Sequence, residues 1–311
     1  PPTPPHGPPS ESPSDMTLLQ AIILGIVEGV TEYLPISSTG HLILVAALLG
    51  LDSPERKSAV DAFNIVVQGG AILAVLGLYR ARVAQMIRGL LGRDAAGARL
   101  AVNLVVAFLP AAGVGVLIDD IIEAHLFYPG PVITALVVGG LYMIGLDQWR
   151  QGRFSMPRPR SAELEIEDLT PRQALVIGLM QCVAMWPGTS RSMMTITGGM
   201  VAGLRPAAAA EFSFLLGLPT LGAACLYKLA KDLARAGEVG PNGEVHRSMF
   251  ELLGAAPVVL GLVTATVSAA LAVTWLVGFL NRHGLSPFGW YRIVLGVVLL
   301  GLIAGGTLVW G

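Results

Sequence analysis

The sequence has few charged residues and very few cysteines. Of its 311 residues 13% are charged, whereas soluble domains average about 25%, so an ordinary soluble protein is excluded. The two cysteines, Cys182 and Cys225, lie in apolar stretches and are too few for a disulfide framework or a metal site. A net charge of −1 and the lack of a basic run argue against nucleic acid as a partner.

Apolar and small residues are abundant instead. Hydrophobic residues make up 53% of the chain, and there are 38 glycines, which allow membrane helices to pack closely. We therefore predict a single integral membrane domain over residues 16–311. Residues 1–15 are rich in proline and serine and are predicted to be a disordered tail, whether native or added.

Hydropathy divides the membrane domain into long and short apolar segments. A helix that crosses the ~30 Å hydrocarbon core needs about 20 residues. The six predicted transmembrane helices are 59–79, 99–118, 130–148, 207–228, 250–280 and 291–310. The short segments form two pairs, each interrupted at a proline: 16–34 with 37–51, and 172–186 with 190–203. Interrupted backbone at membrane depth is tolerated only inside protein or beside a watery cavity, so both pairs are predicted to be re-entrant helical hairpins.

The order of these segments repeats, since a hairpin and three spans are followed by a hairpin and three spans. In both halves a glycine lies ahead of the proline. The third residue after that glycine is an acid in the first half and an amide in the second. An odd number of spans in each half makes the repeat inverted. The predicted fold class is therefore an all-α polytopic membrane protein with an inverted repeat, whose halves cover about 16–149 and about 172–311.

Basic residues orient the predicted bundle. The segments 80–99 and 149–172 each carry five arginines, whereas 119–129 has neither lysine nor arginine. By the positive-inside rule the first two are predicted to be cytoplasmic loops and the third an external loop. The segment 229–249 is then expected to be external, although it holds three basic residues.

The first hairpin carries polar side chains that are costly at membrane depth. Glu28 and Glu32 are four residues apart and share one face of a helix. Two carboxylates in a dry site need a cation between them or a shared proton. The turn that begins at Pro35 adds hydroxyls where helix N-caps belong, then a glycine and a histidine. These residues are Ser37, Ser38, Thr39, Gly40 and His41.

The second hairpin has a similar turn after Pro187, with Thr189, Ser190 and Arg191. Helix starts attract anions, and the arginine fork suits bidentate phosphate binding. We expect the two turns to meet and form one phosphate site, with the carboxylates and His41 beside it for hydrolysis. The plainer alternatives are caps for the hydroxyls, a packing hydrogen bond for His41, and snorkelling to a lipid headgroup for Arg191.

These motifs together resemble those of the bacterial undecaprenyl-diphosphate phosphatase family, also called the bacitracin-resistance protein family. The resemblance covers residues 16–311, and Met193 departs from it because the family usually has a small residue there. Its motifs are the glutamates of the first hairpin, PISSTGH at 35–41, PGTSRS at 187–192 and EFSFLLGLP at 211–219.

The resemblance implies hydrolysis of undecaprenyl diphosphate to undecaprenyl phosphate and inorganic phosphate. This reaction recycles the carrier lipid of peptidoglycan synthesis and confers bacitracin resistance. It also implies a bacterial inner-membrane location, an active site facing the external side, and a divalent cation, Mg²⁺ or Ca²⁺, near Glu28 and Glu32. The implied catalytic residues are Glu28, Glu32, Ser38, His41 and Arg191. Phosphate binding would use Ser37, Thr39, Gly40, Thr189, Ser190 and Arg191.

Several alternatives stay open at this point. The nucleophile is either Ser38 or a water activated by Glu32 or His41. An inverted-repeat transporter or lipid flippase could use the same polar midplane site. A phosphatidic-acid-type phosphatase is rejected, because no histidine after Arg191 is followed by an aspartate four residues on. The expected partners are the bilayer and the lipid substrate, and a homodimer is compatible with the sequence.

Overall fold

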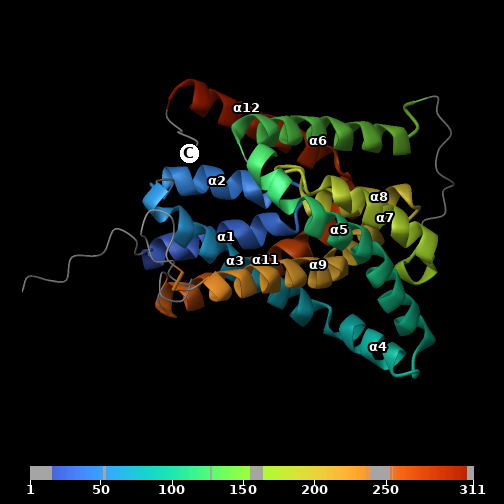
Figure 1. The fold of residues 1–311 in the computed structure, drawn as a ribbon. Coiled ribbons are helices and arrows are strands. Elements are labelled where there is room, and N and C mark those ends of the chain that lie inside the picture. Colours follow the sequence, from blue (N-terminus) through green and yellow to red (C-terminus); the bar gives the residue numbers. More distant parts are fainter. Residues whose placement is uncertain are drawn as a thin grey trace, which may run out of the picture.

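The computed structural model describes residues 16–51, 54–126, 128–154, 164–235, 237–238, 253 and 255–306, and these form helices and turns without a β-strand. The all-α fold class is thus confirmed (Figure 1). The helices are α1 (Leu18–Glu32), α2 (Ser38–Leu48), α3 (Pro54–Leu78), α4 (Arg80–Leu90), α5 (Ala95–Leu126), α6 (Pro129–Arg150), η1 (Ile166–Asp168), α7 (Pro171–Val183), α8 (Arg191–Val201), α9 (Pro206–Arg235), α11 (Ala255–His283) and α12 (Ser286–Ala304).

Six of these helices are long and apolar enough to cross a membrane, namely α3, α5, α6, α9, α11 and α12. They coincide with the six predicted spans, and the chain is a polytopic membrane protein. Two predicted loops are wrong. The segment 80–99 contains α4, because its alanine, methionine, glutamine and arginine residues favour helix despite their charge. The predicted loop 119–129 is mostly the end of α5, which continues to Leu126.

Three predictions concern residues outside the described ranges. The tail 1–15 lies there, as do residues 155–163 of the predicted 149–172 loop. Most of the 229–249 segment also lies outside, although α9 includes its residues up to Arg235.

Each pair of short helices is closed by the same hydrogen bonds. A threonine opens both α1 and α7 with a capping box, whose partner is the glutamine three residues later. That glutamine also reaches the end of the second helix of the pair. Gln20 donates to the carbonyl oxygen of Leu49 over 3.3 Å, and Gln173 donates to that of Ala202 over 2.7 Å. These hydrogen bonds therefore close two similar helical hairpins, α1–α2 and α7–α8.

The two hairpins are related by a constant shift of 153 residues. This shift carries Gln20 to Gln173, and it carries Gly50 to Gly203, which both follow the second helix with positive φ. Figure 1 shows the hairpins extending from opposite ends of the bundle, with their turns near its centre. This is the geometry that an inverted repeat requires.

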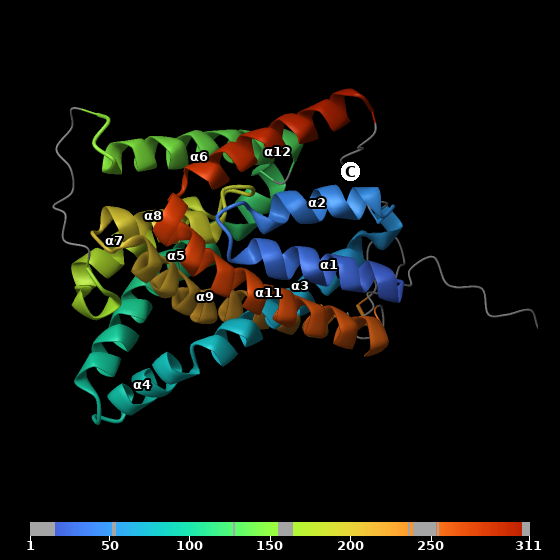
Figure 2. The same ribbon diagram turned by 180° about the vertical axis from the view of Figure 1, so that it is seen from behind.

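Each hairpin packs against a span of the other half. Helix α1 lies along α11, and α7 lies along α5, which holds the same place in the first half. The first spans α3 and α9 pack together, as do the last spans α6 and α12 (Figures 1 and 2). Helix α1 approaches α11 so closely at Gly29 that a side chain would not fit there. A Cβ on this residue would lie 2.1 Å from Ser268 Oγ and 2.4 Å from the carbonyl oxygen of Ala265. The halves therefore interlock and hold both turns in place.

Candidate active site

The two turns meet at the centre of the bundle, as the sequence predicts. The hydroxyl of the fully buried Ser192, at the start of α8, donates to the carbonyl oxygen of Leu34 in the first turn over 2.8 Å. Arg191 donates through its NH2 group to Glu32 Oε1 over 3.0 Å, and the two side chains are 11% and 6% exposed. One hydrogen bond and one ion pair thus join the hairpins at their tips.

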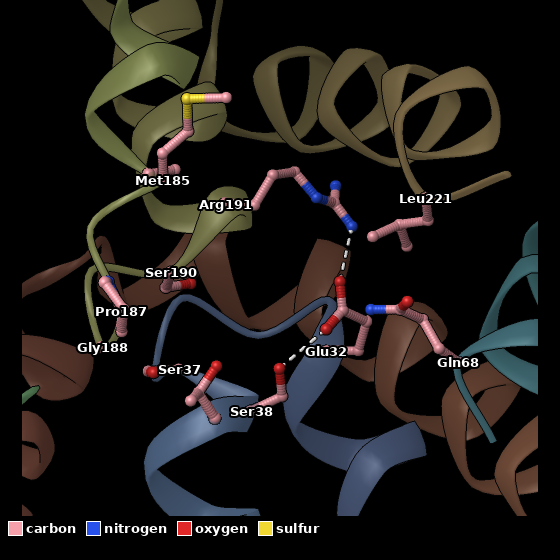
Figure 3. A pocket seen from close by; sticks show the side chains of 12 residues that line it. Glu32, Ser37, Ser38, Gln68, Met185, Pro187, Gly188, Ser190, Arg191 and Leu221 are labelled. Atoms are coloured by element: carbon pink, nitrogen blue, oxygen red, sulfur yellow. Dashed lines mark hydrogen bonds and ion pairs between the residues drawn. The ribbon is translucent and has the colours of Figure 1, made fainter. Parts of the chain in front are cut away.

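Glu32 lies at the middle of this contact (Figure 3). While Oε1 accepts from Arg191, Oε2 accepts from the Ser38 hydroxyl over 2.7 Å. Arg191 also donates to the carbonyl oxygen of Ser213 over 3.1 Å and lies 5.2 Å from the centre of the Tyr33 ring. The guanidinium is therefore held in one orientation, and each of its terminal nitrogens keeps a second N–H for a ligand.

A cavity of about 210 Å³ opens beside these groups. Six of the predicted site residues line it, which supports the prediction that the two turns form one site. The lining residues are Glu32, Ser37, Ser38, Thr39, Gln68, Ala184, Met185, Pro187, Gly188, Ser190, Arg191 and Leu221.

Four predicted site residues lie outside the cavity lining: Glu28, Gly40, His41 and Thr189. Glu28 is 2% exposed, one turn before Glu32, and its Oε2 has no hydrogen-bond partner in the described part of the chain. The backbone N–H of Gly40 donates to Ser37 Oγ at 3.5 Å, and that of Thr189 donates to the carbonyl oxygen of Trp186 at 3.1 Å. These two N–H groups are therefore already engaged within the turns.

His41 faces α12 instead of the cavity. Its Nδ1 lies 2.7 Å from the carbonyl oxygen of Ser37, and its Nε2 lies 2.7 Å from the hydroxyl of Tyr291. A carbonyl can only accept, so Nδ1 carries the proton in the neutral ring and Nε2 accepts from Tyr291. The two rings are also stacked. This structure thus places His41 behind the first turn, where it holds the Ser37 backbone.

Ser37 and Ser190 occupy equivalent, strained positions. Both have positive φ, 74° and 76°, and they are the non-glycine residues of the described chain that do. Such a conformation costs on the order of 1–3 kcal/mol. Each serine nevertheless caps its helix, because Ser37 Oγ accepts from the N–H of Gly40 and Ser190 Oγ accepts from that of Met193. The capping hydrogen bond offsets part of this strain. Glycine would adopt this φ without strain but has no side-chain oxygen to cap the helix.

The cavity lies between equivalent residues of the two repeats. The 153-residue shift pairs lining residues with each other, but their chemistry differs between the halves. The pairs are Glu32 with Met185, Ser37 with Ser190, and Ser38 with Arg191. At these positions the first repeat supplies a carboxylate and two hydroxyls, whereas the second supplies an apolar thioether, a hydroxyl and a cation.

Sequence reasoning missed Arg292, which lies in α12 and is fully buried. Its NH2 group donates to the carbonyl oxygens of Ala135 and Gly188 over 2.8 and 2.9 Å, and NH1 donates to that of Pro35 over 3.5 Å. Pro35 and Gly188 are equivalent positions of the two turns. A lone arginine inside an apolar span was the signal that could have revealed it.

The described residues fit a divalent cation only in part. They hold no group of three or more His, Cys, Asp or Glu side chains that could bind a metal. However, Mg²⁺ is commonly held by one or two carboxylates together with substrate phosphates and water. The buried, unpartnered Oε2 of Glu28, next to Glu32, is an acceptor of the kind such an ion needs. The pair therefore fits an ion whose coordination a phosphate completes.

Comparison with known proteins places the chain in a family. Residues 21–298 match the family model described as bacitracin resistance protein BacA. An undecaprenyl-diphosphatase of Sorangium cellulosum is 47% identical over 92% of this chain and 87% of its own length. The undecaprenyl-diphosphatase of Variovorax paradoxus and undecaprenyl-diphosphatase 2 of Rhodospirillum rubrum are 42% and 44% identical, each over 94% of this chain and 97% of their own. On this evidence the chain belongs to the bacitracin resistance protein BacA family.

Proposed function

We propose that this chain hydrolyses undecaprenyl diphosphate to undecaprenyl phosphate and inorganic phosphate, and so recycles the carrier lipid and confers bacitracin resistance. The names of its relatives support the substrate. The single structural observation that carries the proposal is the chain of contacts from Arg191 through Glu32 to Ser38 at the cavity wall. These contacts support the proposal that Arg191 is the phosphate-binding cation, Glu32 the base and Ser38 the nucleophile, because the three side chains lie side by side.

The proposed chemistry begins with the diphosphate bound to Arg191 and to the hydroxyls of the two turns. Ser38 Oγ attacks the terminal phosphorus while its proton passes to Glu32 Oε2, 2.7 Å away. The bond from that phosphorus to the bridging oxygen breaks, and undecaprenyl phosphate leaves. Water then attacks the phosphoserine, Ser38 recovers its proton from Glu32, and inorganic phosphate is released. Arg191 stabilises the charge on the phosphoryl oxygens in both steps.

Glu28 and Glu32 would hold the Mg²⁺ or Ca²⁺ ion that the resemblance implies. When bound, such an ion would neutralise negative charge on the phosphates. We also propose that the site faces the external side. The first hairpin extends away from α4 in Figure 1, and α4 carries three arginines, which favour the cytoplasmic side.

Phosphate release by the purified protein tests the activity and the cation together. We expect turnover of undecaprenyl diphosphate in detergent, a loss of at least about 100-fold with EDTA, and recovery when Mg²⁺ or Ca²⁺ is restored. In sealed right-side-out vesicles the phosphate should be found outside. Turnover unaffected by EDTA would rule out the cation, whereas a folded protein that moves lipid without releasing phosphate would be a transporter.

A phosphoserine test distinguishes the two possible nucleophiles. With substrate labelled in its terminal phosphate, an acid quench during turnover should trap label on the wild-type protein and none on Ser38→Ala. Ser268→Ala, on α11, is the control and should trap as much as the wild type. Turnover retained by Ser38→Ala, with no label on either protein, would instead identify water as the nucleophile.

A further inference from the structure

Gln68 is the polar residue of the cavity lining that neither the motifs nor the proposed chemistry uses. It lies on α3, and Figure 3 shows it across the cavity from Pro187 and Gly188 of the second turn. Figure 3 shows its amide nitrogen turned toward Glu32. Both oxygens of Glu32 already accept hydrogen bonds, from Arg191 and Ser38, so the carboxylate does not require a donor from Gln68.

A neighbouring thiol fixes the direction of this amide. Cys225 on α9 donates through Sγ to Gln68 Oε1 over 3.2 Å. With its oxygen satisfied from the α9 side, the amide presents its two N–H groups to the cavity. Within the described ranges no acceptor is hydrogen-bonded to that nitrogen, and it is not among the buried polar atoms that lack a partner. The donors are therefore accessible from the cavity.

Packing alone does not account for a polar residue here. Leu221 on α9 lines the same cavity, so an apolar side chain is compatible with its wall. An amide at membrane depth, by contrast, is costly unless its polar atoms are paired. The free N–H groups of Gln68 accordingly point to a ligand that accepts hydrogen bonds.

We propose that Gln68 is a substrate-binding residue, whose amide N–H groups donate to a phosphoryl oxygen of the diphosphate while Cys225 holds the amide in place. This inference rests on the proposed function. A diphosphate has more acceptor oxygens than the open N–H groups of Arg191 can satisfy. A neutral donor adds a contact without competing with Arg191 for Glu32, as a second cation would.

Steady-state kinetics of Gln68 variants test the proposal. Gln68→Glu keeps the size but replaces both donors by a charged acceptor, so KM should rise at least about 10-fold. Gln68→Leu removes both donors without adding a charge and should raise KM about 5-fold. Cys225→Ser keeps a donor and should leave KM unchanged. Cys225→Ala should raise KM about 2-fold, and should add nothing in the Gln68→Leu background, because both changes act on one contact.

A binding measurement separates failure of this proposal from failure of the proposed function. Inorganic pyrophosphate is titrated into detergent-purified wild type and Gln68→Glu, and the heat of binding is measured. Weaker binding by the variant supports the proposal whether or not the protein turns over lipid. The proposal would be overturned if Gln68→Glu and Gln68→Leu were both active with the wild-type KM. It would also be overturned if wild type and Gln68→Glu bound pyrophosphate with equal affinity. Absence of turnover in the wild type would overturn the proposed function alone.

Discussion

Arg191→Lys should lower kcat/KM for undecaprenyl diphosphate by about 10²–10³-fold, although the charge is kept. Lysine cannot reproduce the planar fork that contacts Glu32 and Ser213 together and still offers N–H groups to a ligand. The loss should be expressed mainly in kcat, because the charge on the phosphoryl oxygens is redistributed in the transition state. Phosphate release over a range of substrate concentrations measures both parameters.

The matched control is Arg205→Lys. Arg205 also pairs with a glutamate, Glu165, but this ion pair lies at the surface and far from the cavity, with side chains 35% and 49% exposed. Exposed pairs of this kind contribute about 0–1 kcal/mol. We expect wild-type turnover and a nearly unchanged melting temperature. If Arg191→Lys kept turnover within a few-fold of this control, Arg191 would not be the phosphate-binding cation.

The second large effect is expected at Arg292. Arg292→Met keeps the bulk of the side chain but leaves the carbonyl oxygens of Ala135 and Gly188 without their donor in a site closed to water. Hydrogen bonds to a charged group contribute about 1.5–3 kcal/mol each, so we expect a destabilisation of at least about 3 kcal/mol. The two turns should also separate, with a parallel loss of turnover.

Thermal melting in detergent, with turnover measured well below the melting temperature, tests this prediction. Arg282→Met is the control, since Arg282 lies in the exposed last turn of α11. An Arg292→Met protein with the wild-type melting temperature and full turnover would show that the turns hold together without this clamp. Arg292→Lys should be intermediate, because one ammonium group cannot reach acceptors on both turns and α6.

The sequence predicted the parts of this fold that depend on composition and spacing. The six spans follow from hydropathy, and the two hairpins follow from prolines beside hydroxyls in short apolar helices. The meeting of the turns was predicted from the two similar proline-hydroxyl turns and their fit to a phosphate, and the structure joins them through the ion pair of Glu32 and Arg191. These features are local or pairwise, so a single sequence contains them.

The features that the sequence did not reveal depend on backbone groups that become free only in three dimensions. Interrupting a helix at a turn leaves carbonyl oxygens unpaired, and Arg292 satisfies those of Pro35 and Gly188 from a distant helix. The direction of His41 depends in the same way on Tyr291 of α12. Gln68 shares a helix face with Asp61 and Asn64, and the sequence could not distinguish a cavity residue from a bridge between helices.

The pairing of cavity residues between the repeats has a consequence for how a substrate can lie. A cavity formed by two identical halves would accept a molecule in either of two opposite directions with equal energy. Undecaprenyl diphosphate has a polar head and an apolar tail, so only one of these directions can bring its terminal phosphate to a nucleophile. By differing at Glu32 and Met185, and at Ser38 and Arg191, the halves remove this ambiguity. Their divergence gives the site a polarity, and therefore a single productive direction of entry for the lipid.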